Sequence, residues 1–147
     1  MTAVGDPGPA APGRPGGLAL LVVVSYGSAA LVEANLGAMT LPGGVEVVVV
    51  DCFSTPRERT AVARLAARHG WRAVLLEDNR GFGGGVNAGA ALAAELGADV
   101  IATLNPDATI DAEALTLLVT HARTHPEAIA SPRIVGSAGE VWFAGAD

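Results

Sequence analysis

Two runs of aliphatic residues constrain the fold of this chain more than any other feature. The segments LALLVVVSY (18–26) and VEVVVVD (45–51) are apolar almost throughout and rich in valine. A strand needs such a continuous run when both of its faces are covered, whereas a strand with one face in water alternates apolar and polar residues. The two runs therefore predict buried strands of a parallel α/β sheet.

Helical patterns alternate with these runs along the chain. Thr55, Pro56 and Glu58 begin the clearest one, as N-cap, first helical residue and capping-box partner. Ser28 and Asp111 are the expected N-caps of two others. The alternation predicts βαβ units with right-handed crossovers, and hence a mostly parallel, Rossmann-like sheet flanked by helices. The remaining predictions are helices at 28–39, 54–70, 86–98 and 112–124, strands at 71–77 and 99–105, and two short strands at 128–135 and 140–146.

The charge of the chain limits what it can bind. The net charge is −6, and all nine basic residues are arginines. A nucleic-acid surface needs a basic patch, and a phosphate-binding P-loop needs a lysine. We therefore expect no nucleic-acid partner. A phosphorylated ligand would be held instead by a metal ion, by arginines or by N–H groups at a helix start.

The chain of 147 residues fits one domain. Residues 1–17 hold four prolines and five glycines and are predicted to be a disordered leader, so the fold is expected over 18–147. The single cysteine, Cys52, allows no internal disulfide and suits a reducing compartment. No apolar run approaches the ~20 residues of a membrane span. These features favour a cytoplasmic location.

Acidic and small polar residues collect where the four main predicted strands end. In parallel sheets, ligands bind outside the carboxyl ends of the strands, near the point where the strand order reverses. We therefore expect these residues to share one rim and to form a ligand site. They are Ser25 and Tyr26 after the first strand, Asp51 at the end of the second, Asp78 and Asn79 after the third, and Asn105 and Asp107 after the fourth.

The glycine-rich segment EDNRGFGGGVNAG (77–89) lies on the same rim. With little Cβ bulk, a loop of this kind can bring backbone N–H groups against a phosphate, and the following helix adds a favourable dipole. Asp107 is a candidate ligand for Mg²⁺ or Mn²⁺. One carboxylate suffices for such an ion only if phosphate oxygens complete its coordination.

A second interpretation of the glycines is a dinucleotide site. Gly83, Gly85 and Ala88 spell G-x-G-x-x-A between a strand and a helix, and Asp107 follows near the position of a ribose-binding acid. This fingerprint normally follows the first strand of its sheet, but here it follows the third. It also leaves Asp51 without a role, so the NAD(P) interpretation stays an alternative.

Taken together, the four strand ends resemble those of the family 2 glycosyltransferases with the GT-A fold, and most closely the rhamnosyltransferase-like branch. The resemblance rests on VVVSYGS, VEVVVVDCFS, DNRGFGGGVNAG and LNPDATIDAEAL, and it extends from Leu18 to about Val135. The combination of NRGFGGGVNAG with LNPD is the most specific part. Phe53 departs from the pattern, because glycine is usual there and permits a positive φ, so this loop is expected to be reshaped.

The resemblance implies roles for residues of the rim. Asp51 would bind the base or ribose of a nucleotide-diphosphate-sugar donor, and Asn105 would lie near the ribose or the sugar. Asp107 would bind the metal and the diphosphate. Gly83, Gly84 and Asn87 would line the donor pocket.

The resemblance also implies an inverting, metal-dependent transfer to a saccharide or lipid-linked acceptor. No counterpart of the acceptor half is recognisable, and no residue is nominated as the catalytic base. We therefore expect this chain to act as a donor-binding half that transfers sugar poorly alone. Partners would be a complementing C-terminal half or a second copy, and a peripheral position at the inner face of the membrane stays open. The third interpretation is a non-catalytic remnant.

Overall fold

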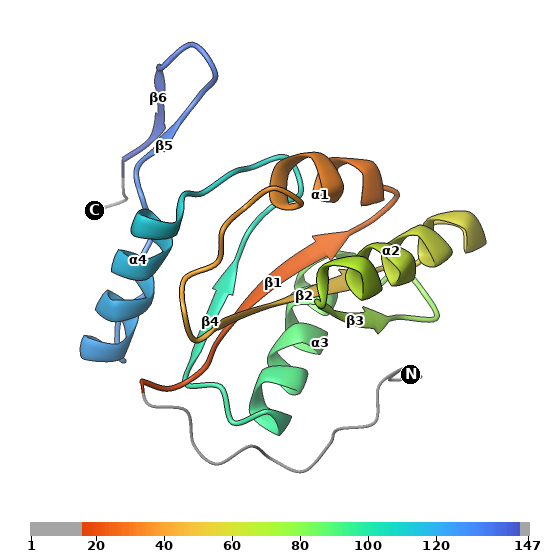
Figure 1. Ribbon diagram of the computed structural model, residues 1–147, viewed down its shortest axis with the longest axis horizontal. Helices are drawn as coiled ribbons and strands as arrows, with labels where there is room; N and C mark the ends of the chain where they lie inside the picture. The colour runs from red at the N-terminus through yellow and green to blue at the C-terminus, as the bar shows by residue number, and fades with distance from the viewer. Residues whose placement is uncertain (1–15, 145–147) are drawn as a thin grey trace.

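The computed structural model describes residues 16–144, which contain an α/β domain (Figure 1). The predicted leader, 1–17, lies outside the described residues except for Gly16 and Gly17. The elements in chain order are β1 (Ala19–Ser25), α1 (Ala29–Leu36), β2 (Val45–Asp51), α2 (Pro56–His69), β3 (Arg72–Leu75), α3 (Gly81–Glu95), β4 (Val100–Thr103), α4 (Ala112–Thr124), β5 (Ile134–Val135) and β6 (Val141–Phe143).

The main sheet has four strands in the order β3-β2-β1-β4. All three pairings are parallel, which confirms the predicted sheet type. The two valine-rich runs form the central strands, and every residue of β1 is buried. The strand order reverses between β1 and β4, which is where ligands bind in open α/β sheets.

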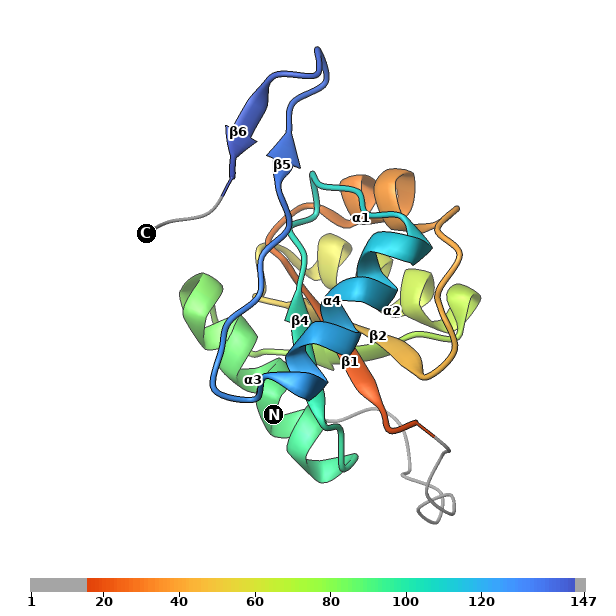
Figure 2. The ribbon, with the colours of Figure 1, turned by 90° about the vertical axis from the view of Figure 1, so that its left-hand side faces the viewer.

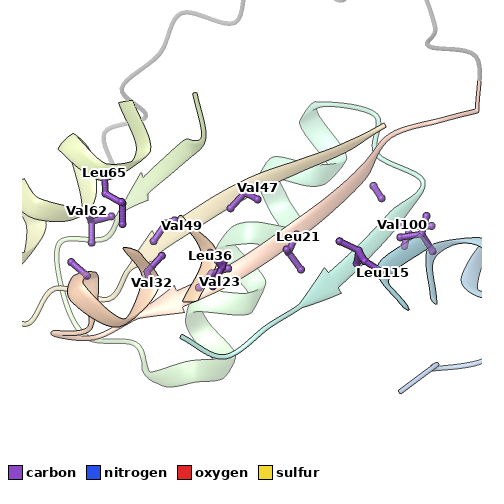
Figure 3. Close-up of a cluster of buried hydrophobic side chains, with 13 residues drawn as sticks. Leu21, Val23, Val32, Leu36, Val47, Val49, Val62, Leu65, Val100 and Leu115 are labelled. Atoms are coloured by element: carbon purple, nitrogen blue, oxygen red, sulfur yellow. The ribbon is translucent and has the colours of Figure 1, made fainter. Parts of the chain in front are cut away.

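Helices cover both faces of this sheet, so the domain has three layers (Figure 2). Alternate residues of β1 and β2 point to opposite faces, as the pleat requires. One core lies between the sheet and the helices α1, α2 and α4, with Val32, Leu65 and Leu115 among its members (Figure 3). The other lies between the sheet and α3, where Ala93 is buried. Continuous valine runs are needed because both faces are covered.

The start of α2 is largely as predicted. Thr55 is the N-cap, and its hydroxyl accepts a hydrogen bond from the Glu58 N–H at 3.1 Å. The other half of the predicted capping box is wrong, because the Glu58 carboxylate accepts from the Ala29 N–H of α1 at 3.2 Å. Ser28 precedes α1 but makes no side-chain cap, and its hydroxyl lies 3.1 Å from that of Ser25. Glu58 thus supplies an acceptor for the first turn of α1.

The helix after the glycine-rich segment begins earlier than predicted. It starts at Gly81 rather than at Val86, so Gly83 and Gly84 are helical and not part of a loop. The side chain of Asn79 accepts a hydrogen bond from the Gly81 N–H at 2.9 Å and helps to begin the helix. Glycine has a poor helix propensity, but packing of this helix against the sheet outweighs it.

Two glycines of α3 allow that close packing. A Cβ on Gly85 would lie 2.6 Å from a methyl group of Val24, and one on Gly89 would lie 2.5 Å from a methyl group of Val22. These two positions are one helical turn apart and face the sheet. The glycine pattern therefore reflects helix–sheet contact as well as any contact with a ligand.

The last two strands are shorter than predicted. Of the expected segments 128–135 and 140–146, only Ile134–Val135 and Val141–Phe143 are strands. They pair with each other in antiparallel orientation. The resulting hairpin extends away from the main sheet (Figure 1).

Substitution of Gly89 tests the packing of α3. Gly89→Ala should lower the free energy of unfolding by about 1–3 kcal/mol, because the new methyl group collides with Val22 on a buried strand. Gly83→Ala is the matched control. A Cβ there meets nothing within 4 Å, so alanine should raise stability by about 0.5–1 kcal/mol through its higher helix propensity. Urea denaturation of both variants measures the difference, and equal effects would contradict this packing.

Candidate functional site

The carboxyl ends of three strands are aligned at one edge of the sheet. Ser25 of β1 pairs with Asp51 of β2, and Asp51 pairs with Leu75 of β3. The fourth strand is shorter, since its last residue, Thr103, pairs with Val22. The predicted rim therefore exists, and its β4 side is set back where the strand order reverses.

Asp51 is the most unusual residue of this rim. Its side chain is 0% exposed, and neither carboxylate oxygen has a hydrogen-bond partner within the described residues. A buried carboxylate without hydrogen bonds is costly, because it loses its hydration without replacement. Burial raises the pKa of Asp51, and the nearby guanidinium of Arg59 opposes that shift. Such a group has unused acceptor capacity for a ligand.

Arg59 of α2 is a residue of the rim that sequence analysis missed. Its Nε lies 4.0 Å from an Asp51 oxygen, and its Nη2 donates a hydrogen bond to the Leu76 carbonyl at 2.7 Å. Its guanidinium carbon also lies 5.3 Å from the ring centroid of Phe53. The available signal was a cation in the first turn of a predicted helix, where the helix dipole is unfavourable to it.

The loop after β2 contains a strained residue. Phe53 has a φ of 40°, and it is the one non-glycine residue with positive φ in the range 16–144. The expected reshaping of this loop at the glycine position is therefore wrong: the phenylalanine adopts the left-handed conformation itself. Such a conformation costs of order 1–3 kcal/mol and tends to occur at functional sites. The contact with Arg59 helps to hold it.

An open pocket of about 240 Å³ lies on the α3 side of the rim. It joins two predicted residues, Tyr26 and Asn79, with four that were not predicted: Val24, Cys52, Gly81 and Phe82. The rings of Tyr26 and Phe82 are 59% and 55% exposed. Two accessible rings beside a largely apolar hollow could hold a planar group by stacking.

The side chains of Asp51 and Cys52 point to opposite faces of the sheet. Cys52 belongs to the core against α3, and its thiol lies 3.6 Å from the Gly81 carbonyl oxygen, to which it donates. Burial raises the pKa of this thiol, with a further contribution from the charge of Asp51. A buried thiol of this kind is unreactive. Asp51 instead faces Arg59 of α2, and it does not line the pocket beside Tyr26.

The remaining predicted residues are distributed around this edge. Ser25 is buried, whereas Asp78 is exposed and forms an ion pair with Arg80 at 2.9 Å. Exposed positions on α3 and on the segment between β4 and α4 hold Gly83, Asn87, Asn105 and Asp107, and Gly84 is half-buried.

The segment that carries Asp107 is tied to α1. Asn35 donates a hydrogen bond from its side-chain nitrogen to the Pro106 carbonyl at 2.7 Å. Across residues 16–144, no group of three or more His, Cys, Asp or Glu side chains could hold a metal ion. The donor set around Asp107 therefore fits a hard cation only when ligand oxygens supply most of the coordination.

The buried carboxylate predicts a pH-dependent stability. The pKa of Asp51 is raised in the folded chain, so the stabilising effect of its protonated form is present below its ordinary value of 3.8 and is lost as the pH rises through the folded-state pKa. Asp51→Asn cannot ionise. It should therefore gain stability relative to the wild type as the pH increases, with no gain in acid.

Asp99 gives the opposite sign and serves as the control. A hydrogen bond from Arg123 lowers the pKa of Asp99. Its stabilising effect is present above its ordinary value of 3.8 and is lost as the pH falls through the folded-state pKa. Asp99→Asn should thus be less stable than the wild type near neutrality. Thermal unfolding of both variants between pH 3 and pH 8 checks the two signs, and equal signs would refute the assignment for Asp51.

Similarities to solved structures support this description of the fold. A mannosyltransferase, PcManGT from Pyrobaculum calidifontis, solved with GDP-Man and Mn²⁺, matches at 24% identity and a TM-score of 0.60, over 88% of this chain and 37% of its own. TarS 1-349 from S. aureus matches at 22% identity and a TM-score of 0.56, over 74% of this chain and 33% of its own. TarS 1-349 has also been solved with UDP-GlcNAc. The chain thus spans about a third of each matched structure.

The sequence itself carries the family assignment. No curated protein matches the chain significantly.

Within the part of the chain that the structure describes, no helix is both long and apolar enough to span a bilayer. Residues 21–146 match the model of glycosyl transferase family 2, and the parallel sheet with flanking helices is that of the GT-A fold. The chain belongs to glycosyl transferase family 2.

Proposed function

We propose that this chain binds the nucleotide-diphosphate-sugar donor of an inverting, metal-dependent glycosyl transfer, and that the rim around Asp51, α3 and Asp107 is the donor site. The observation that carries the proposal is the buried carboxylate of Asp51, whose oxygens find no hydrogen-bond partner among residues 16–144 and which lies at the aligned strand ends. If no ligand bound the Asp51 carboxylate, replacing this residue with an uncharged one would make the fold more stable.

Asp51 would accept a hydrogen bond from an N–H of the base or from a ribose hydroxyl. Its oxygens are covered in the structure, so the loop after β2 must shift to admit the donor. The positive φ of Phe53 favours such a shift, because leaving that conformation releases strain. Ser25, the neighbour of Asp51 on β1, would lie beside the nucleoside.

The diphosphate would lie between the start of α3 and Asp107. The start of α3 places its positive dipole end at the rim; the Gly81 N–H donates to Asn79, and Gly83 leaves the next turn of backbone accessible there. Asn79 and Asp78 would border the same site, with Gly84 and Asn87 farther along α3. The chain has no lysine, so the partial positive charge at the start of α3 would be an important attraction for the diphosphate.

Asp107 would hold Mg²⁺ or Mn²⁺ together with the diphosphate oxygens, and Asn105 would lie near the ribose or the sugar. When bound, the metal supplies a Lewis acid that offsets the charge on the departing diphosphate. A structural neighbour, PcManGT, was solved with GDP-Man and Mn²⁺, and a nucleotide-diphosphate-sugar with a divalent metal is the class of ligand that we propose for this site.

The reaction would be a displacement at the anomeric carbon. An acceptor hydroxyl of a saccharide or lipid-linked glycan forms the new C–O bond, the bond to the diphosphate breaks with inversion, and a carboxylate base removes the hydroxyl proton. None of the described residues is assigned as that base. The rhamnosyltransferase-like specificity, the association with a complementing half or a second copy, and the cytoplasmic or peripheral location stay predictions.

The dinucleotide alternative has less structural support. Gly83 and Gly85 lie inside α3 rather than at the turn before it, and Gly85 packs against Val24. The second glycine of the fingerprint approaches the pyrophosphate. That glycine would be Gly85, which is buried against the sheet and cannot do so.

Calorimetric titration separates these functions. UDP, GDP and dTDP should bind the wild-type chain only in the presence of Mn²⁺ or Mg²⁺, and Asp107→Ala should abolish that metal dependence, because residues 16–144 contain no cluster of three or more metal-binding side chains that could hold the ion instead. Glu113→Gln, which removes an exposed carboxylate from α4, is the control and should bind as the wild type does. Binding of NADH without metal would favour the dinucleotide function, and binding of none of these ligands would favour a remnant without catalytic function.

A further inference from the structure

The contacts of Arg59 suggest a role beyond packing. This residue is part of α2, but its guanidinium reaches the ends of β2 and β3 and the loop between β2 and α2. The guanidinium lies beside Asp51 at the end of β2 and donates to the Leu76 carbonyl just after β3. Its central carbon lies over the ring of Phe53, 5.3 Å from the ring centroid.

The spacing between Arg59 and Asp51 is informative. At 4.0 Å the two groups attract each other without a hydrogen bond. Arginine commonly binds a carboxylate through two parallel N–H···O bonds, and that geometry uses the lone pairs of both oxygens. Here the Nη2 group is occupied by the Leu76 carbonyl at 2.7 Å, which holds the guanidinium short of that arrangement. The Asp51 oxygens therefore keep their acceptor capacity.

We propose that Arg59 is a positioning residue of the donor site, which holds its charge beside Asp51 while leaving both carboxylate oxygens free for the nucleoside. This inference rests on the proposed function, since it assigns Arg59 a part in the same site. The hydrogen bond to the Leu76 carbonyl fixes the position of the guanidinium, and the ring of Phe53 packs against the guanidinium as well.

The electrostatic surroundings of Asp51 support this role. Burial raises the pKa of Asp51, the Arg59 cation and, more weakly, the backbone N–H of Phe53 lower it, and Glu58 raises it slightly more. Glu58 and Arg59 come from the same turn of α2, and Cys52 follows Asp51 directly after the end of β2. Arg59 is thus the cation that opposes protonation of this carboxylate. If Arg59 had only a structural role, its contacts with Leu76 and Phe53 would stabilise the fold equally well with a neutral residue at position 51.

Variants of Arg59 in the full chain distinguish the two roles. Nucleotide affinity with Mn²⁺ is measured against pH for UDP, GDP and dTDP, and the Asp51 carboxyl is titrated by ¹³C NMR without nucleotide. In Arg59→Gln the acid limb of binding and the Asp51 titration should both move to higher pH, and affinity at neutral pH should fall about 10-fold or more. Arg59→Lys keeps the cation and should stay near the wild type. Arg64→Gln removes an exposed charge from the same helix and is the control.

The outcomes separate the two levels of inference. An Asp51 titration that is unchanged in Arg59→Gln, or shifted equally in Arg59→Lys, would overturn the role of Arg59. If Arg59→Gln does not fold, adding Asp51→Asn should restore folding by removing the uncompensated carboxylate, and failure to do so would also overturn it. Absence of nucleotide binding by the wild type would instead reject the proposed function.

Discussion

The geometry of the rim depends on the parallel register between β1 and β2. This register places Ser25 beside Asp51 and continues to Leu75 of β3. A slip of one residue would turn Asp51 toward α3 and Cys52 toward Arg59, because successive side chains point to opposite faces. The valine runs alone fix this register weakly, since both faces are apolar. Gly85 of α3 adds specificity that the runs lack, because a Cβ there would lie 2.6 Å from Val24 of β1 and 3.0 Å from the sulfur of Cys52, which follows β2.

The site concentrates unfavourable features that the rest of the domain avoids. Asp51 is buried, with no hydrogen-bond partner for its carboxylate in the described part of the chain, and Phe53 has a positive φ. Both lie within reach of Arg59, which offsets part of each cost through charge and through its contact with the ring. Elsewhere the described core is almost wholly aliphatic. Departures of this kind from an otherwise consistent fold are expected at functional sites.

Sequence analysis predicted the sheet well because its signals are local. Apolar runs identify β1 and β2, and the Thr55 cap identifies the start of α2. It failed where tertiary contact overrides local preference. The glycines at 81–85 argue against a helix by propensity, yet packing on the sheet makes them helical. The carboxylate of Glu58 accepts a hydrogen bond from α1 instead of capping its own helix. Arg59 was missed because its contacts are with residues at the ends of β2 and β3, which are distant in sequence from α2.

Paramagnetic broadening by Mn²⁺ tests most directly whether one ligand joins these elements. Amide signals of the ¹⁵N-labelled chain are recorded with Mn²⁺ and UDP, GDP or dTDP in turn. The proposed site predicts that broadening concentrates at Asn105–Ala108 and Gly81–Gly84, with weaker effects near Ser25 and Asp51, and that it needs the nucleotide. Broadening confined to α2, or to the hairpin of β5 and β6, would contradict a shared donor site at this edge of the sheet.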